Sequence, residues 1–273
     1  LANQGLKFDN CYLTASSCSP SRNSIMTGRY PHNTGACELH TQPPEDMLSL
    51  PEVLKENGYF TAQAGKFHMG TYIEKAFDVI SQKYSEIGNS GSDSWLKVVK
   101  ERPKNKPFFL WLAALDAHRA WGENQYSGTH DPEEIEPPFY LADGEKTKAD
   151  LGNYYDEIYR FDRRIDEVVN ELKKEGVLDN TMIIIMADNG RPFPHNKTRV
   201  NDRGMKTPFI IYWPEQIKQK AETKSLVSVI DIAPTVLDYA GIKPKESFQG
   251  KSFSKVIKDP EKAFRNYLFA EHN

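Results

Sequence analysis

Long apolar runs, an excess of positive charge and internal repeats are all missing from this chain, and each absence excludes a class of protein. No apolar stretch approaches the roughly 20 residues that a membrane-spanning helix needs, so no membrane span is expected. Lys and Arg number 35 against 38 Asp and Glu, a formal net charge of −3, which gives no reason to expect nucleic acid as a partner. Any attraction for an anionic ligand must therefore be local.

Cysteine is also scarce. The chain has three cysteines, an odd number and too few for a framework of disulfide bonds. Cys11 and Cys37 are expected to be small buried hydrophobic residues, with a bridge between them as the alternative. Cys18 differs because it directly precedes the run Ser-Pro-Ser-Arg, which is typical of the first turn of a helix.

Common phosphate and metal motifs are incomplete or missing. Gly65-Lys66 is similar to the end of a phosphate-binding loop, but Phe60 and Phe67 occupy the positions of its first glycine and its Ser or Thr. Neither the dinucleotide motif G-x-G-x-x-G nor the zinc motif H-E-x-x-H occurs. The sequence thus argues against an NTPase, a dehydrogenase of the dinucleotide-binding type and a zinc protease of the H-E-x-x-H type.

Strand and helix patterns alternate along the chain. Short apolar runs typical of buried strands occupy residues 8–15, 59–65, 107–115, 181–190 and 207–214. Helical patterns occupy residues 52–58, 92–103, about 149–175 and 228–241, and a polar loop is expected over about 116–147. This alternation predicts an α/β fold with a doubly wound, mostly parallel sheet and helices on both faces.

At both ends, the sequence has the pattern of a helix or strand that continues beyond the given residues. Residues 1–5 are typical of a last helical turn with a glycine stop, and residues 266–273 are typical of a strand. We therefore expect the fold to be incomplete at both ends.

Polar residues gather where the expected strands end, which is where ligands bind in open α/β sheets. Taken singly, each of them has a plain structural interpretation, as a surface charge, a turn residue or a satisfied histidine. Taken together at strand ends, they indicate a site. These residues are Lys66, His68, Asp116, His118, Arg119, Asp188, Asn189 and Lys197.

The stretch "CSPSRNSIMTGR" at residues 18–29 adds a helix start to this site. Pro20 suits a first helical turn, and Ser19 and Ser21 are good capping residues. Cys18 then lies at a helix N-terminus, where free N–H groups favour an anion, and Arg22 follows one turn later. Two interpretations stay open: a buried cysteine at a helix cap, or a nucleophile that faces a bound oxyanion.

These residues resemble the motifs of the sulfatase family, within the alkaline-phosphatase-like superfamily. "CSPSRNSIMTGR" is similar to the signature C-x-P-S-R-x-x-x-x-T-G-R, and "GKFHMG" to G-K-W-H-x-G. "DNG" followed by Lys197 resembles the family's second metal motif, and the landmarks run in the family's order from about Phe8 to Trp213. Within the family, "DNGRPFPHNKT", "LDAHRAW" and "FAEHN" resemble the N-sulfatases of heparan-type sugars and their bacterial relatives.

The resemblance implies a chemistry for Cys18. A formylglycine-generating enzyme or maturase oxidises such a cysteine to formylglycine, whose hydrated aldehyde attacks sulfur with one hydroxyl and expels sulfate through the other. A plain serine lacks that second hydroxyl. Preorganised positive charge is expected to carry much of such a reaction.

The resemblance also implies roles for the other residues. Arg22 and a Ca²⁺ ion hold the nucleophile and the sulfate, and Cys18, Asp188 and Asn189 are the expected metal ligands. Lys66 and Lys197 neutralise the sulfuryl oxygens, His68 assists the nucleophile and His118 protonates the leaving group. Contact with the sugar, with a plain surface role as the alternative, is expected of Asp116, Arg119, Arg191 and His272.

One departure from the family pattern matters. Sulfatases bind calcium with an Asp-Asp pair at the end of the first strand, and this sequence has no such pair, with only seventeen residues before Cys18. Residues 1–273 are thus expected to form one catalytic domain without its first strand and without the small C-terminal subdomain. Because Ca²⁺ takes six to eight oxygens, we expect this chain to hold little or no metal and to be inactive.

Three functions follow from these expectations. The leading one is a sulfatase that cleaves the N-sulfate of glucosamine in heparan-type glycans. The alternatives are an O-sulfatase or a related phospho- or phosphonate-ester hydrolase, and a non-catalytic protein that binds sulfated glycans through an unmodified Cys18. By resemblance the protein is periplasmic, secreted or lysosomal, its partner is a sulfated carbohydrate, and a homodimer is one allowed assembly.

Overall fold

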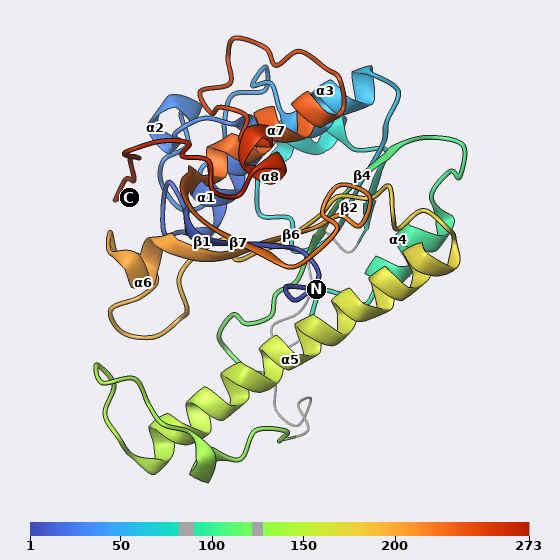
Figure 1. Cartoon of the computed structure of the whole chain (residues 1–273). Helices are drawn as coiled ribbons and strands as arrows, with labels where there is room; N and C mark the ends of the chain where they lie inside the picture. The colour runs from blue at the N-terminus through green and yellow to red at the C-terminus, as the bar shows by residue number, and fades with distance from the viewer. Residues whose placement is uncertain (82–89, 122–127, 273) are drawn as a thin grey trace.

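The computed structural model describes residues 1–81, 90–121 and 128–272 as two groups of strands with helices on both sides (Figure 1). The strands are β1 (Leu6–Tyr12), β2 (Phe60–Gly65), β3 (Val79–Ser81), β4 (Phe108–Ala113), β5 (Ile183–Met186), β6 (Lys206–Tyr212) and β7 (Ala221–Ser228). The α-helices are α1 (Cys18–Thr27), α2 (Pro31–Thr34), α3 (Leu50–Glu56), α4 (Trp95–Glu101), α5 (Glu145–Lys174), α6 (Asp202–Met205), α7 (Ile232–Tyr239) and α8 (Ser254–Lys258). The 3₁₀ helices of the described residues are η1 (Thr71–Ala76), η2 (Pro132–Glu134) and η3 (Val229–Asp231).

The predicted α/β class with a mostly parallel sheet is confirmed. The strands form two groups, in the orders β5-β6-β1-β7 and β3-β2-β4. Strand β2 is parallel to β3 and β4, and β1 is parallel to β7, whereas β6 is antiparallel to both β1 and β5. No helical crossover precedes β6, only the single turn of α6, so the chain returns in the opposite direction. In Figure 1, α1, α3, α7 and α8 lie on one side of the strands, and α4 and α5 lie on the other.

Apolar packing holds each strand group to its helices. In β1, Leu6 and Phe8 are buried while Lys7 between them is exposed, as alternation along a half-buried strand requires. Phe8 meets Phe209 of β6 edge to face, with ring centroids 5.1 Å apart. On the other side, Trp95 of α4 packs in the same way on Phe161 of α5, at 5.8 Å. The two cores fix the strand ends from which the site is built.

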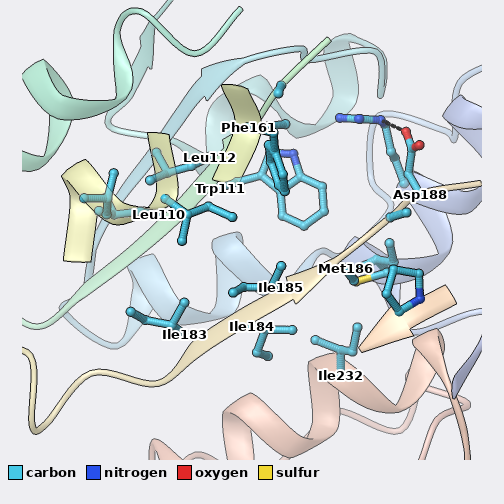
Figure 2. Close-up of a pocket in the computed structure, with 18 of the residues that line it drawn as sticks. Leu110, Trp111, Leu112, Phe161, Ile183, Ile184, Ile185, Met186, Asp188 and Ile232 are labelled. Atoms are coloured by element: carbon cyan, nitrogen blue, oxygen red, sulfur yellow. Dashed lines mark hydrogen bonds and ion pairs between the residues drawn. The ribbon is translucent and has the colours of Figure 1, made fainter. Parts of the chain in front are cut away.

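A cavity of about 1260 Å³ lies between β4 and β5, the facing strands of the two groups. Its walls are apolar side chains, and its far end is polar, where Asp188 follows β5 (Figure 2). The labelled apolar residues in that view are Leu110, Trp111, Leu112, Phe161, Ile183, Ile184, Ile185, Met186 and Ile232. Strands β2, β4 and β5 all direct their carboxyl ends to this polar end, so the cavity opens into the site described below.

Several expectations about the chain are wrong in detail. Residues 1–5 form turns, and at the C-terminal end only Glu271 pairs with Ala15, as an isolated bridge. Helix α5 begins at Glu145, earlier than about 149, because Gly144 in extended backbone serves as its N-cap. Cys37 is exposed, just past the turn at Gly35, so it is not a buried hydrophobic residue and forms no bridge with the buried Cys11.

Parts of two predicted segments lie outside the described residues: 122–127 of the loop and the last residue of the C-terminal strand. Within the described part, none of the helices combines the length and the apolar character needed to cross a bilayer.

Candidate active site

Helix α1 places Cys18 at its first position. Its N-cap is Ser17, in extended backbone, so the prediction of Ser19 or Ser21 as the capping residue is wrong. The Oγ of Ser19 instead accepts a hydrogen bond from the backbone N–H of His40 at 2.9 Å. Every residue of α1 is buried, which keeps the N–H groups of its first turn in a low-dielectric region where they favour an anion.

Three distant segments converge on the sulfur of Cys18. The Nζ atoms of Lys66 and Lys197 each lie 3.3 Å from Sγ, and Oδ1 of Asn189 lies 3.0 Å from it. Lys66 follows Gly65, whose φ of +86° brings the backbone so close to Ala113 that a Cβ would lie 2.0 Å from its carbonyl oxygen. A side chain at this position is excluded, so the turn that delivers Lys66 requires glycine.

The second lysine is held by a backbone contact. The N–H of Thr198, next to Lys197, donates to the carbonyl oxygen of Ser16 at 2.9 Å. The hydroxyl of Ser16 donates to the carbonyl oxygen of Gly204 at 2.7 Å. These bonds tie the loop before β6 to the residues just ahead of Cys18 and keep Lys197 over the sulfur.

A buried ion pair forms the floor of the site. The Nε of Arg22 donates to Oδ2 of Asp188 at 2.7 Å, and the Nζ of Lys66 lies 3.7 Å from the same oxygen. Arg22 also donates to the carbonyl oxygen of Lys66 at 2.9 Å. Burial raises the pKa of Asp188, but the charges of Lys66 and Arg22 outweigh it and hold that pKa well below the usual range of a carboxyl.

The same surroundings lower the pKa of the Cys18 thiol. Burial and the charge of Asp188 raise the pKa of Cys18, but hydrogen bonds from His118 and His68 and the charge of Lys66 outweigh them and lower it to about 4. This pKa favours the thiolate form of Cys18 at neutral pH. Because its pKa is lower in the folded chain, its contribution to stability is complete above the ordinary thiol pKa and is lost as the pH falls through about 4.

Alkylation of unmodified Cys18 by iodoacetamide is accordingly expected to be nearly independent of pH between about 5.5 and 8. The free thiol of N-acetylcysteine, the control, gains about tenfold in rate per pH unit in that range because its pKa is near 8.5. Peptide mass spectrometry follows the adduct at Cys18 alone. A rate at Cys18 that rises in parallel with the control would show that the thiol is protonated.

Sequence reasoning missed His40. The Nδ1 of His40 lies 2.9 Å from Nε2 of His68, and both residues have left-handed backbone, with φ of +68° and +48°. One of these two nitrogens donates a proton to the other, so the tautomer of one ring fixes the tautomer of the other. His40 thereby orients His68, which hydrogen-bonds Cys18. The only signal in the sequence is a histidine in a polar loop, which on its own indicates nothing.

Asp116 and Arg119, two of the predicted sugar contacts, are engaged by other side chains of the protein, and their contact with a sugar stays a prediction. The carboxylate of Asp116 is 1% exposed and pairs with Arg160, and Ser90 also donates to it, at 2.8 Å. Arg119 donates from Nη1 to Asp150 at 3.0 Å and lies over the ring of Trp121 at 4.9 Å. In both cases these contacts hold the loop that carries His118.

Two further candidates differ in position. Arg191 lines the cavity near Asp188 and Lys197. His272 is exposed, and it follows Glu271, whose backbone N–H donates to the carbonyl oxygen of Thr14 at 2.7 Å, close in sequence to Cys18. Both stay predictions for contact with a substrate.

Asp188 and Asn189 do not by themselves fit a calcium site. A Ca²⁺ ion takes six to eight oxygens, whereas here the Asp188 carboxylate is engaged by Arg22 and Lys66. Across residues 1–81, 90–121 and 128–272, no group of three or more His, Cys, Asp or Glu side chains is placed to hold a metal. The chemistry proposed below therefore uses only the protein's own groups.

The fold and the site define an α/β protein with a cluster of cationic side chains around a buried cysteine. Known structures share this fold. A phosphonate monoester hydrolase from Silicibacter pomeroyi superposes with a TM-score of 0.81 at 18% identity, over 97% of this chain and 72% of its own. A protein in complex with its substrate D-glucosamine-2-N,6-O-disulfate superposes with a TM-score of 0.77 at 21% identity, over 98% and 76%.

The chain belongs to the sulfatase family, whose model matches residues 1–242. Human N-sulphoglucosamine sulphohydrolase is 30% identical over 276 residues, which cover 89% of this chain and 55% of that protein. An ulvan-active sulfatase from Formosa agariphila is 27% identical, over 97% of this chain and 51% of its own length. The chain thus spans about half the length of these two relatives.

Proposed function

We propose that the protein is a sugar sulfatase that removes the N-sulfate group of glucosamine in heparan-type glycans. The observation that carries this proposal is the pair of ammonium groups of Lys66 and Lys197, each 3.3 Å from the Cys18 sulfur at a buried helix N-terminus. A tetrahedral sulfuryl group bound there meets positive charge that is already in place. The 30% identity to a protein named N-sulphoglucosamine sulphohydrolase supports the N-sulfate assignment.

The surroundings of Cys18 also fit the formylglycine that the family resemblance implies. The donors that hold a thiolate can hold the oxygens of such a group, and when formed it supplies a nucleophilic hydroxyl in place of the thiol. Lys66 and Lys197 then neutralise the sulfuryl oxygens, and Arg22, anchored by Asp188, fixes the floor. His118, which is exposed at the mouth, donates a proton to the departing nitrogen or oxygen.

Other features of the protein stay predictions. They include the Ca²⁺ ion, the maturation enzyme that modifies Cys18, a homodimer, and a periplasmic, secreted or lysosomal location. We further infer that residues 1–273 act as one catalytic domain.

A second candidate function is hydrolysis of an O-sulfate, phosphate or phosphonate ester. The likeness to a phosphonate monoester hydrolase favours it, because a cation cluster of this kind suits any tetrahedral anion. Binding of sulfated glycans without catalysis is a third, and it requires Cys18 to stay a thiol.

A substrate panel separates these functions. The natural full-length protein is expected to hydrolyse N-sulfoglucosamine at least about tenfold faster, as kcat/KM, than glucosamine 6-sulfate or an aryl phosphate, a difference of about 1.4 kcal/mol in the transition state. A Cys18→Ala variant is the control for contaminating activity. Turnover of the aryl phosphate alone would reject the sulfatase proposal.

A further inference from the structure

We propose that the protein binds a second anionic sugar unit at a rim formed by Phe139, Tyr140 and Arg203, here named the rim subsite. The identity of the sugar that reacts at Cys18 rests on the proposed function. Occupation of the rim subsite by an anionic glycan is a statement about binding and is tested separately below.

The rim subsite combines an aromatic platform with a cation. Phe139 is 89% exposed, an extreme value for a large apolar side chain. The guanidinium of Arg203 lies 4.4 Å from the ring centre of Tyr140 and 5.2 Å from that of Phe139. An aromatic face packs against the apolar C–H face of a sugar ring, and a guanidinium binds sulfate or carboxylate through two parallel hydrogen bonds. The combination suits a charged sugar better than a neutral one.

Contacts connect the rim subsite to Cys18. The hydroxyl of Tyr140 donates to Oδ1 of Asn196 at 3.3 Å, and the adjacent Lys197 places its Nζ 3.3 Å from the Cys18 sulfur. Arg203 lines the same cavity as Arg22 and Lys66. A glycan with one sugar at Cys18 therefore has its neighbouring unit within reach of the rim.

The charge of this segment is opposite to that of the whole chain. Residues 191–206 carry five cations and one carboxylate, although the formal net charge of the protein is −3. Within the described residues, no carboxylate forms an ion pair with any of these five cations, which are Arg191, Lys197, Arg199, Arg203 and Lys206. Concentrated positive charge that no carboxylate neutralises, beside the cation cluster at Cys18, is the complement of a polyanionic chain.

The test compares a long and a short ligand by isothermal calorimetry. The probes are a heparin-derived hexasaccharide and the monosaccharide N-sulfoglucosamine, and the protein is the natural full-length form carrying Cys18→Ala to prevent turnover. We expect Phe139→Ala and Arg203→Gln each to raise the Kd of the hexasaccharide about tenfold and to leave the Kd of the monosaccharide unchanged. Salt is expected to weaken hexasaccharide binding less in Arg203→Gln than in the parent.

The matched control is Arg163→Gln, which removes an exposed arginine on α5 that is not one of the rim residues. Unchanged hexasaccharide binding in both rim variants would overturn the rim subsite while the monosaccharide result still supports the proposed function. Monosaccharide binding that is absent while the hexasaccharide still depends on Phe139 and Arg203 would overturn the proposed function and support the subsite. If Arg163→Gln weakens hexasaccharide binding as much as the rim variants do, the effect reflects the overall charge of the protein, and the rim subsite is overturned.

Discussion

Replacing Lys66 or Lys197 with methionine is expected to lower kcat/KM for N-sulfoglucosamine about 10²–10³-fold. Each ammonium group lies 3.3 Å from the Cys18 sulfur, where negative charge gathers as the sulfuryl group is transferred. Methionine keeps most of the side-chain volume and removes the charge, so the loss reports electrostatics. Because the charge is needed most in the transition state, kcat is expected to fall more than KM rises.

Lys197→Met is the cleaner of the two variants, because Lys66 also lies 3.7 Å from Asp188 and its loss disturbs the floor of the site. The control is Lys7→Met, which removes a lysine that pairs with Asp9 on the exposed face of β1. Steady-state kinetics of the natural full-length protein provide the measurement. A change of less than about threefold in Lys197→Met, with the fold intact, would remove this lysine from the proposed chemistry.

Replacing Asp188 with alanine is expected to lower the free energy of unfolding by about 3–5 kcal/mol. The side chains of Arg22 and Lys66 are only 5% and 10% exposed, and Asp188 is the carboxylate that both face. Without it, both buried cations lose their carboxylate partner, and removing one partner of a buried pair is far more costly than losing a surface pair. Urea denaturation followed by fluorescence measures the change.

The pH dependence of stability provides a second measurement on the same residue. Because the pKa of Asp188 is held below its unfolded value, its contribution is complete above about pH 4 and is lost as the pH falls further. Asp188→Asn is therefore expected to lose less stability than the parent on acidification below pH 4. Asp9→Ala, which breaks a surface pair, is the control and should cost about 1 kcal/mol or less. A loss of that size in Asp188→Ala would contradict the role of the buried pair.

Local signals explain what the sequence could predict. Pro20 in a first helical turn and Gly28 at the end of α1 are signals that act within a few residues, so the position of Cys18 at a helix N-terminus was predictable. The strand-end rule gathered Lys66, His118 and Asp188, because parallel strands deliver their carboxyl ends to one edge of a sheet.

Contacts between residues far apart in the chain explain which features the sequence could not predict. Asp116 pairs with Arg160 of α5, 44 residues later, and no pattern around either residue predicts this ion pair. His40 reaches His68 across 28 residues from a polar loop. The direction of β6 depends on its pairing with β1, almost 200 positions earlier in the chain, and no pattern within the strand encodes it.

Cys18 and the chemical state of its side chain are at the centre of this account. Peptide mass spectrometry of protein isolated from its own cells measures that state directly. The peptide that contains residue 18 should be lighter by the difference between a thiol and an aldehyde, and it should react with a hydrazide. An intact thiol at residue 18, in protein that still releases sulfate from N-sulfoglucosamine, would contradict the proposal that a formylglycine at this position carries the reaction.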